Sequence, residues 1–160
     1  MTPPYRVGDE LPPLEIPVTR TLIVAGAIAS RDYQDVHHDA ASAREKGSPD
    51  IFMNILTTNG LVGRYITDHF GPTAVLRKVA IRLGAPNYPG DVLRLTGRIT
   101  ELRTADASSA DTSSADASSD EVVDAVEAVV QVTGGNGIGR HVTGTVAVTL
   151  PEPSAERAGA

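Results

Sequence analysis

The residues best suited to chemistry are concentrated in one polar segment, residues 31–39 (Arg-Asp-Tyr-Gln-Asp-Val-His-His-Asp), within an otherwise apolar part of the chain. Asp32 and His37 lie five positions apart in this segment. A carboxylate and an imidazole can together orient a water molecule, remove its proton and return a proton to a nearby carbon, because the pKa of each group can be tuned toward neutral pH. Spacing alone is weak evidence, since an Asp and a His in a loop are usually ordinary polar residues.

The neighbouring polar residues have simpler interpretations. His38 is the alternative imidazole, but the spacing from the Asp favours His37. Asp35 and Asp39 are interpreted as structural, the latter as the cap of a following helix. Two further histidines are interpreted as surface or strand-edge residues, His69 and His141. No additional ligands converge on an Asp/His metal site, so no metal is predicted.

Composition narrows the class of protein. The chain has 160 residues, which fits one domain, and 41% of them are hydrophobic, enough for a core. Its formal net charge of -6 argues against a nucleic-acid partner, which requires a basic face. No apolar run approaches the roughly 20 residues that span a bilayer, and residues 1–8 lack the apolar region of a signal peptide. Cysteine is absent, which excludes disulfides and thiol catalysis and is compatible with a cytoplasmic location.

The order of elements begins with two helices after a strand. Residues 1–17, rich in proline and acidic residues, are predicted to be an arm that leads into the domain. The apolar, β-branched stretch 18–29 indicates a first strand. Helices are predicted over 40–46 and over 49–70, where Ser-Pro marks the start of the second helix and Gly-Pro its end.

The second helix is apolar on nearly every face, which is typical of a buried helix. Gly60 and Gly63 would let another backbone approach it closely. Its N-terminus, near residues 50–54, offers free backbone N–H groups and the favourable end of the helix dipole to a negatively charged oxygen.

Four strands are predicted after this helix, over residues 75–83, 91–102, 121–132 and 138–150. A Gly-Gly-Asn-Gly sequence joins the last two and is a strong hairpin signal. Residues 104–120 and 151–160 lack large apolar side chains, so they are predicted to be a disordered loop insertion and a disordered tail. An antiparallel sheet wrapped around one long buried helix satisfies this α+β pattern over residues 18–150, and this arrangement is the hotdog fold. A lone domain would leave a sheet edge and part of the helix exposed, which favours dimerisation.

Residues 30–39 resemble the signature of the MaoC-like, or (R)-specific type 2, enoyl-CoA hydratases. That signature has an Asp, an Asn-Pro pair after one further residue, and a His five residues beyond the Asp. Asp32 and His37 match its two acid/base positions, while Arg, Gln and Asp replace the Gly that precedes the Asp and the Asn-Pro pair. These replacements, together with residues 47–57 and 64–68, are similar to the small MaoC subunit of actinobacterial steroid side-chain enoyl-CoA hydratases.

The resemblance implies that the chain adds water to a 2-enoyl-CoA to give a 3-hydroxyacyl-CoA, with a bulky steroid-derived acyl group. Asp32 and His37 would be the catalytic residues, and a backbone N–H near Asn54 would bind the thioester oxygen. It further implies that no cofactor is needed beyond the coenzyme A thioester of the substrate. A larger MaoC-domain subunit is the implied partner, in a heterodimer or heterotetramer, with a homodimer as the fallback.

Two alternatives stay open. The first is a generic (R)-specific fatty enoyl-CoA hydratase or 3-hydroxyacyl-thioester dehydratase, and the second is a non-catalytic hotdog subunit that stabilises a partner. The turn at residues 84–90 would lie near the acyl tunnel by the same resemblance. Four basic residues are candidates for contacts with coenzyme A phosphates, although a solvated sheet face is the simpler interpretation: Arg77, Lys78, Arg82 and Arg94.

Overall fold

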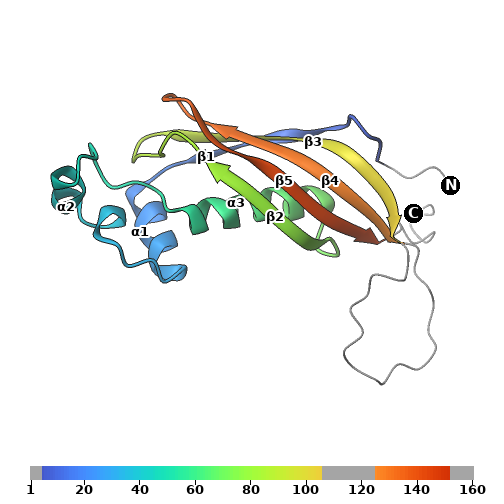
Figure 1. The fold of residues 1–160 in the computed structure, drawn as a ribbon, viewed down its shortest axis with the longest axis horizontal. Coiled ribbons are helices and arrows are strands. Elements are labelled where there is room, and N and C mark those ends of the chain that lie inside the picture. Colours follow the sequence, from blue (N-terminus) through green and yellow to red (C-terminus); the bar gives the residue numbers. More distant parts are fainter. Residues whose placement is uncertain (1–4, 106–124, 152–160) are drawn as a thin grey trace, which may run out of the picture.

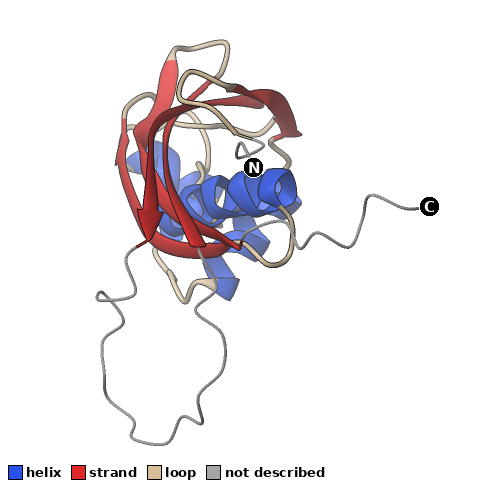
Figure 2. Ribbon diagram, turned by 90° about the vertical axis from the view of Figure 1, so that its right-hand side faces the viewer, coloured by secondary structure: helices blue, strands red, loops and turns tan. Residues whose placement is uncertain are grey.

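The computed structural model describes residues 5–105 and 125–151. A curved antiparallel sheet wraps around one helix, and two shorter helices lie beyond one end of the sheet (Figures 1 and 2). The elements in chain order are β1 (Glu10–Pro17), α1 (Arg20–Ala29), the 3-10 turn η1 (Asp35–His37), α2 (Ala40–Glu45), α3 (Ile55–Phe70), β2 (Val75–Leu83), β3 (Val92–Ala105), β4 (Ala125–Gly135) and β5 (Arg140–Pro151). The strand order is β1-β3-β4-β5-β2, with every neighbouring pair antiparallel. The predicted hotdog arrangement is therefore confirmed.

The core lies between α3 and the concave face of the sheet, as the end-on view in Figure 2 shows. Alternate residues of β3, β4 and β5 are buried there, among them Leu93, Leu95, Val130, Val132, Val146 and Val148. Burying a side chain of this kind contributes about 1.5–3 kcal/mol. The helix is amphipathic rather than apolar all round, since Val62 and Ile66 are buried while Ile55 and Leu56 at its start are about half exposed. A Cβ added to Gly63 would lie 3.2 Å from a side-chain carbon of Leu76 of β2, and one added to Gly60 would have nothing within 4 Å, so the predicted close approach of another backbone at these glycines is wrong.

The strand predicted over residues 18–29 is wrong, because this stretch forms α1. Thr19 caps the helix by accepting a hydrogen bond from the N–H of Leu22 (3.0 Å). Ile23 and Ala27, four residues apart, are buried on its inner face, and this helical spacing outweighs the β-branched composition.

The first strand instead lies within the predicted arm. β1 pairs with β3 at an edge of the sheet, with a register shift between Leu11 and Leu14 that accommodates Pro12 and Pro13. Proline is tolerated at an edge or a bulge because no ladder hydrogen bond needs its missing N–H. The proline-rich composition therefore marks an edge strand and not a free arm over Glu10–Pro17.

The start of the long helix was also predicted wrongly. α3 begins at Ile55, about six residues later than the Ser-Pro signal indicates. The residues directly before it are not helical and bond to two other segments: the N–H of Phe52 donates to the carbonyl of Val36 (3.2 Å), and the N–H of Met53 donates to the carbonyl of Asn87 (3.0 Å). These tertiary hydrogen bonds override the local signal, and Asn54 becomes the N-cap.

The remaining elements agree with prediction. The strand over 75–83 and the hairpin between β4 and β5 are confirmed. Asp39 caps α2 through two backbone N–H groups, at 2.8 and 3.1 Å, as predicted. Most of the predicted 104–120 insertion and nearly all of the 151–160 tail lie outside the described residues. Within residues 5–105 and 125–151, no helix has the length and apolar character needed to cross a membrane.

Candidate active site

The end of α1 delivers Asp32 to the site through a defined backbone reversal. Arg31 has φ +57°, in the left-handed region, and its N–H donates to the carbonyl of Ile28 (3.0 Å). The N–H of Asp32 then donates to the carbonyl of Ala27 (2.9 Å). This pair of bonds is the Schellman ending of a helix, which satisfies its last carbonyls and turns the chain sharply. Asp32 therefore leaves α1 in a fixed direction.

His37 lies on η1 and faces Asp32. Its Nε2 is 3.3 Å from Oδ2 of Asp32, and the exposed fractions of the two side chains are 6% and 18%. Its Nδ1 is 2.7 Å from the carbonyl oxygen of Phe52, which can only accept a hydrogen bond. Nδ1 therefore carries the proton, and the Nε2 of a neutral ring presents its lone pair beside the carboxylate. The ring of Phe52 packs edge-on against that of His37, so the imidazole is fixed in orientation as well as in tautomer.

Asn54 holds the carboxylate from the opposite side. Its side-chain Oδ1 accepts the N–H of Thr57 (3.0 Å), which caps α3 and fixes the orientation of the amide. Its Nδ2 can then donate both hydrogens, one to Oδ2 of Asp32 (3.0 Å) and one to the hydroxyl of Ser30 (2.9 Å). Asn54 is 2% exposed, and its side chain makes these three hydrogen bonds in the buried site. This side-chain role was not predicted from the sequence, where only the backbone N–H near Asn54 was a candidate.

Asp32 is the negatively charged member of the pair. The hydrogen bond from Asn54, followed by that from the N–H of Gln34 and by the nearby His37 ring, holds the pKa of Asp32 below its ordinary value, although burial opposes this. An ionised carboxylate and an imidazole lone pair are both acceptors. Because Oδ2 and Nε2 lie only 3.3 Å apart, a water molecule that donates a hydrogen bond to one of them lies within reach of the other.

The start of α3 presents unused donors. Among the hydrogen bonds of the described residues, none uses the backbone N–H of Asn54, Ile55 or Leu56. The first turn of a helix leaves such groups free and carries the positive end of its dipole. These N–H groups are candidate donors to an oxyanion; whether Asn54 serves in this way stays a prediction.

The other predicted polar residues lie outside this pair. His38 is exposed, and its Nε2 lies 3.8 Å from Asp35. Asp35 also faces Lys46 at 3.5 Å, in line with its structural interpretation. His69 is half-buried and packs against Phe70. Among the described residues, no group of three or more His, Asp or Glu side chains is arranged to hold a metal ion.

His141 was predicted wrongly as a surface or strand-edge residue. It is 1% exposed, lies near the start of β5, and hydrogen-bonds Thr58 on α3. A single histidine in an alternating strand gives no sequence signal for its partner, because the partner lies 83 positions away.

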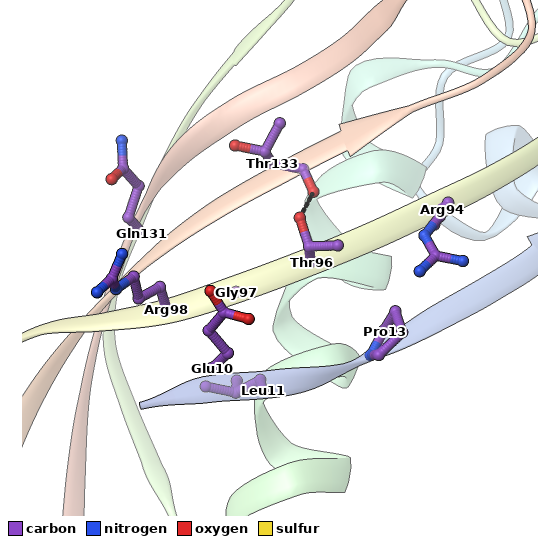
Figure 3. A pocket seen from close by; sticks show the side chains of 9 residues that line it. All are labelled: Glu10, Leu11, Pro13, Arg94, Thr96, Gly97, Arg98, Gln131 and Thr133. Carbon is purple, nitrogen blue, oxygen red and sulfur yellow. Dashed lines mark hydrogen bonds between the residues drawn. The ribbon is translucent and has the colours of Figure 1, made fainter. Parts of the chain in front are cut away.

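Arg94 lies on the outer face of the sheet. It pairs with Glu15 at 2.7 Å and lines a shallow cavity of about 370 Å³ together with Arg98, Thr96 and Thr133 (Figure 3). None of the residues that line this cavity belongs to the Asp32–His37 site. The other three basic candidates are exposed on β2, so a role for any of the four in binding coenzyme A stays a prediction.

No protein-family model matches the chain. It is 40% identical over 144 residues, 90% of this chain and 95% of the relative, to the 3-oxo-4,17-pregnadiene-20-carboxyl-CoA hydratase beta subunit of Mycobacterium tuberculosis. The chain belongs to the MaoC-like hydratase family. The resemblance carried by residues 30–39 is thereby confirmed, as is the assignment to the hydro-lyase class of enzymes.

Solved structures support the same placement. This MaoC-like hydratase superposes on a chain of the ChsH1-ChsH2 complex of M. tuberculosis with a TM-score of 0.73 and 40% identity, covering 94% of this chain and 99% of that one. It also matches the (R)-hydratase of A. caviae with a TM-score of 0.73, 19% identity and coverage of 92% and 98%. At that identity the second match shows the fold alone.

Proposed function

We propose that the chain is the catalytic small subunit of an enoyl-CoA hydratase that acts on a steroid side-chain acyl-CoA. The observation that carries the proposal is the pair of acceptors formed by Asp32 and His37, 3.3 Å apart and held by Asn54 and Phe52. The relative at 40% identity is named for a steroid CoA thioester, which supports the choice of acyl group.

The geometry provides a route for the reaction. A water beside Oδ2 of Asp32 and Nε2 of His37 loses a proton to the imidazole as its oxygen bonds to the β-carbon of the conjugated thioester. Electrons move onto the thioester oxygen, where the free N–H groups at the start of α3 stabilise the charge. The pair then returns one proton to the α-carbon. One water is consumed, the enzyme is regenerated, and no cofactor takes part in this scheme.

Exposed apolar residues near the site support a large acyl group and a protein partner. Ile55 and Leu56 at the start of α3 are each 48% exposed, and Tyr33 beside Asp32 is 66% exposed. β2 pairs with β5 and forms one edge of the described sheet. An edge strand with exposed Val75 and Leu76 favours pairing with a second sheet. We propose a larger MaoC-domain chain as the partner, in keeping with the complex named for the similar structure.

The test measures loss of enoyl absorbance with a steroid 2-enoyl-CoA and with crotonyl-CoA. This chain is assayed alone and mixed with the larger MaoC-domain chain encoded beside it. Turnover of the steroid thioester by the mixture supports the proposal. Turnover of crotonyl-CoA by the lone chain would indicate a generic hydratase instead.

Two variants test the catalytic pair. Asp32→Asn removes the negative charge of the carboxylate, and His37→Gln removes the basic imidazole. Loss of either partner of a general acid–base pair costs typically 10²–10⁴-fold in turnover, so we expect a fall of about that size. The thermal unfolding midpoint stays close to that of the parent chain. A mixture that retains full turnover with either variant would assign the chemistry to the partner chain and leave this chain a structural subunit.

We further propose a cytoplasmic location, supported by the absence of cysteine from the sequence. Fractionation of cells that produce the tagged full chain tests this: recovery with the membranes or outside the cell would contradict it.

A further inference from the structure

A line of buried hydrogen-bonding groups continues from the catalytic carboxylate across the first turn of α3. The carbonyl oxygen of Asn54 lies 3.3 Å from the hydroxyl of Thr58, and that hydroxyl lies 2.8 Å from Nε2 of His141. Nδ1 of His141 lies 2.7 Å from the carbonyl oxygen of Ala85. Thr58 is 0% exposed and His141 is 1% exposed. The path joins three segments: the α3 cap, β5, and the loop that leads from β2 to β3.

The direction of each hydrogen bond follows from which groups can donate. The carbonyl of Ala85 only accepts, so Nδ1 of His141 carries a proton. In the neutral ring Nε2 is then an acceptor, and the hydroxyl of Thr58 must donate to it. Thr58 has one hydroxyl hydrogen, so the longer contact with the carbonyl of Asn54 is not a second full hydrogen bond. Burial lowers the pKa of His141, against the opposing effects of Ala85 and the Asp91 charge, and this favours the neutral ring.

The first turn of α3 depends on these inner contacts for its orientation. On its outer side, Ile55 and Leu56 are about half exposed and supply little packing. On its inner side, Thr58 meets His141, and the preceding residue Met53 donates its N–H to the carbonyl of Asn87. A Thr–His pair is directional, whereas an apolar pair of the same volume would fill the space without fixing a rotation.

We propose that His141 and Thr58 are positioning residues for hydration: the pair fixes the first turn of α3 and, through Asn54, the orientation of the Asp32 carboxylate. Neither residue touches the reacting atoms. The inference rests on the proposed function for its kinetic consequence, but its structural consequence, the environment of Asp32, is measurable without turnover. The titratable group that faces Asp32 is His37 on η1, and the charged group near His141 is Asp91.

The test uses Thr58→Val in the complex with the larger MaoC-domain chain. Val keeps the shape and burial of Thr but cannot donate to His141. A misplaced catalytic group can cost up to about 100-fold in rate, and we expect kcat to fall between about 10- and 100-fold with KM nearly unchanged. The pKa of Asp32, followed by carboxyl ¹³C NMR and by the acid limb of the kcat profile, rises toward its ordinary value because the Asn54 hydrogen bond is weakened.

Two matched variants separate positioning from general destabilisation. Thr58→Ser keeps the hydroxyl, and we expect it to restore kcat and the low pKa of Asp32. Thr67→Val makes the same chemical change near the other end of α3, where the hydroxyl contacts the carbonyl of Arg64, and leaves both quantities unchanged.

The outcomes are distinguishable from failure of the proposed function. If the unmodified complex hydrates no enoyl-CoA, the proposed function fails, and the NMR measurement still decides the positioning role. An unchanged Asp32 pKa in Thr58→Val overturns that role. The positioning role is also overturned if Thr58→Ser loses as much kcat as Thr58→Val. It is likewise overturned if the loss of kcat in Thr58→Val is no larger than the fraction of unfolded protein explains.

Discussion

Asn54→Asp is the sharpest perturbation of the site, because it replaces the donor Nδ2, which contacts Asp32 and Ser30, and preserves the helix cap made by Oδ1. In the parent chain Oδ1 of Asn54 accepts the N–H of Thr57 at 3.0 Å. Asn and Asp are equally good N-cap residues, so an Asp at this position still accepts that hydrogen bond. The atom that changes is Nδ2, which lies 3.0 Å from Oδ2 of Asp32. A donor is replaced by a second carboxylate oxygen, while the helix start is retained.

The expected shift follows from two contributions. A hydrogen bond to a charged group contributes about 1.5–3 kcal/mol, and its loss alone raises the pKa of Asp32 by roughly 1–2 units. Repulsion between two carboxylates adds up to about 4 kcal/mol at ~4 Å and an effective dielectric constant of ~20. Asp32 is 18% exposed, which screens part of this. We expect the pKa of Asp32 to rise by about 2 units or more.

The sign of the pH effect follows from the proposed role of Asp32 as an anion. In the proposed scheme catalysis requires the carboxylate, so activity is lost as the pH falls through the pKa of Asp32. In Asn54→Asp the acid limb of kcat therefore moves to higher pH by about 2 units. The assay is kcat against pH for the assembled enzyme, with carboxyl ¹³C NMR as a check that is independent of turnover.

Two comparisons make the result decisive. Asn54→Ser retains a capping oxygen without adding charge, so its acid limb moves by the smaller hydrogen-bond contribution alone. Asp39→Asn makes a cap-preserving change on α2 and leaves the limb in place. An Asn54→Asp enzyme with an unchanged acid limb and unchanged kcat would refute the inference that Asn54 holds the proposed catalytic carboxylate.

Three further changes test the supporting structure. In Gly26→Ala the new Cβ lies 2.2 Å from the hydroxyl of Thr57, so overpacking lowers the free energy of unfolding by about 1–3 kcal/mol in urea titrations. Adding Thr57→Ala to the same chain relieves the overpacking. An unchanged free energy of unfolding in Gly26→Ala alone would contradict the close α1–α3 contact. Arg31→Gly relieves the left-handed backbone at φ +57° and raises the free energy of unfolding by about 0.5–1 kcal/mol with kcat retained; destabilisation would show that the Arg side chain matters more than the backbone. Burial lowers the pKa of His141 from 6.5, so the stability contributed by the neutral His141 ring is present above pH 6.5 and is lost as the pH falls below that value. We expect His141→Gln to flatten this part of the curve of unfolding free energy against pH. A curve that His141→Gln leaves unaltered would contradict a buried neutral ring.

The parts of the site that the sequence predicts are those with a local signature. The spacing of Asp32 and His37 lies within one loop, and Asp39 caps the helix that follows it directly. β2 is bounded by turn residues on both sides and matches its predicted limits. In each case the interactions that determine the structure fall within a few residues of one another, so residue types and their order are sufficient.

The errors fall where distant segments decide the local conformation. The Ser-Pro start signal for α3 is locally sound, yet hydrogen bonds from Phe52 to Val36 and from Met53 to Asn87 keep these two residues out of the helix. That displacement makes Asn54 the cap, and only a capping residue at this position has its amide beside Asp32. A helix that began at the Ser-Pro would bury Asn54 within the helix and remove the hydrogen bond that keeps Asp32 ionised. The tertiary contacts that overrule the local signal are therefore the same contacts that build the acid/base pair, which is why this part of the site follows from the fold and not from the motif.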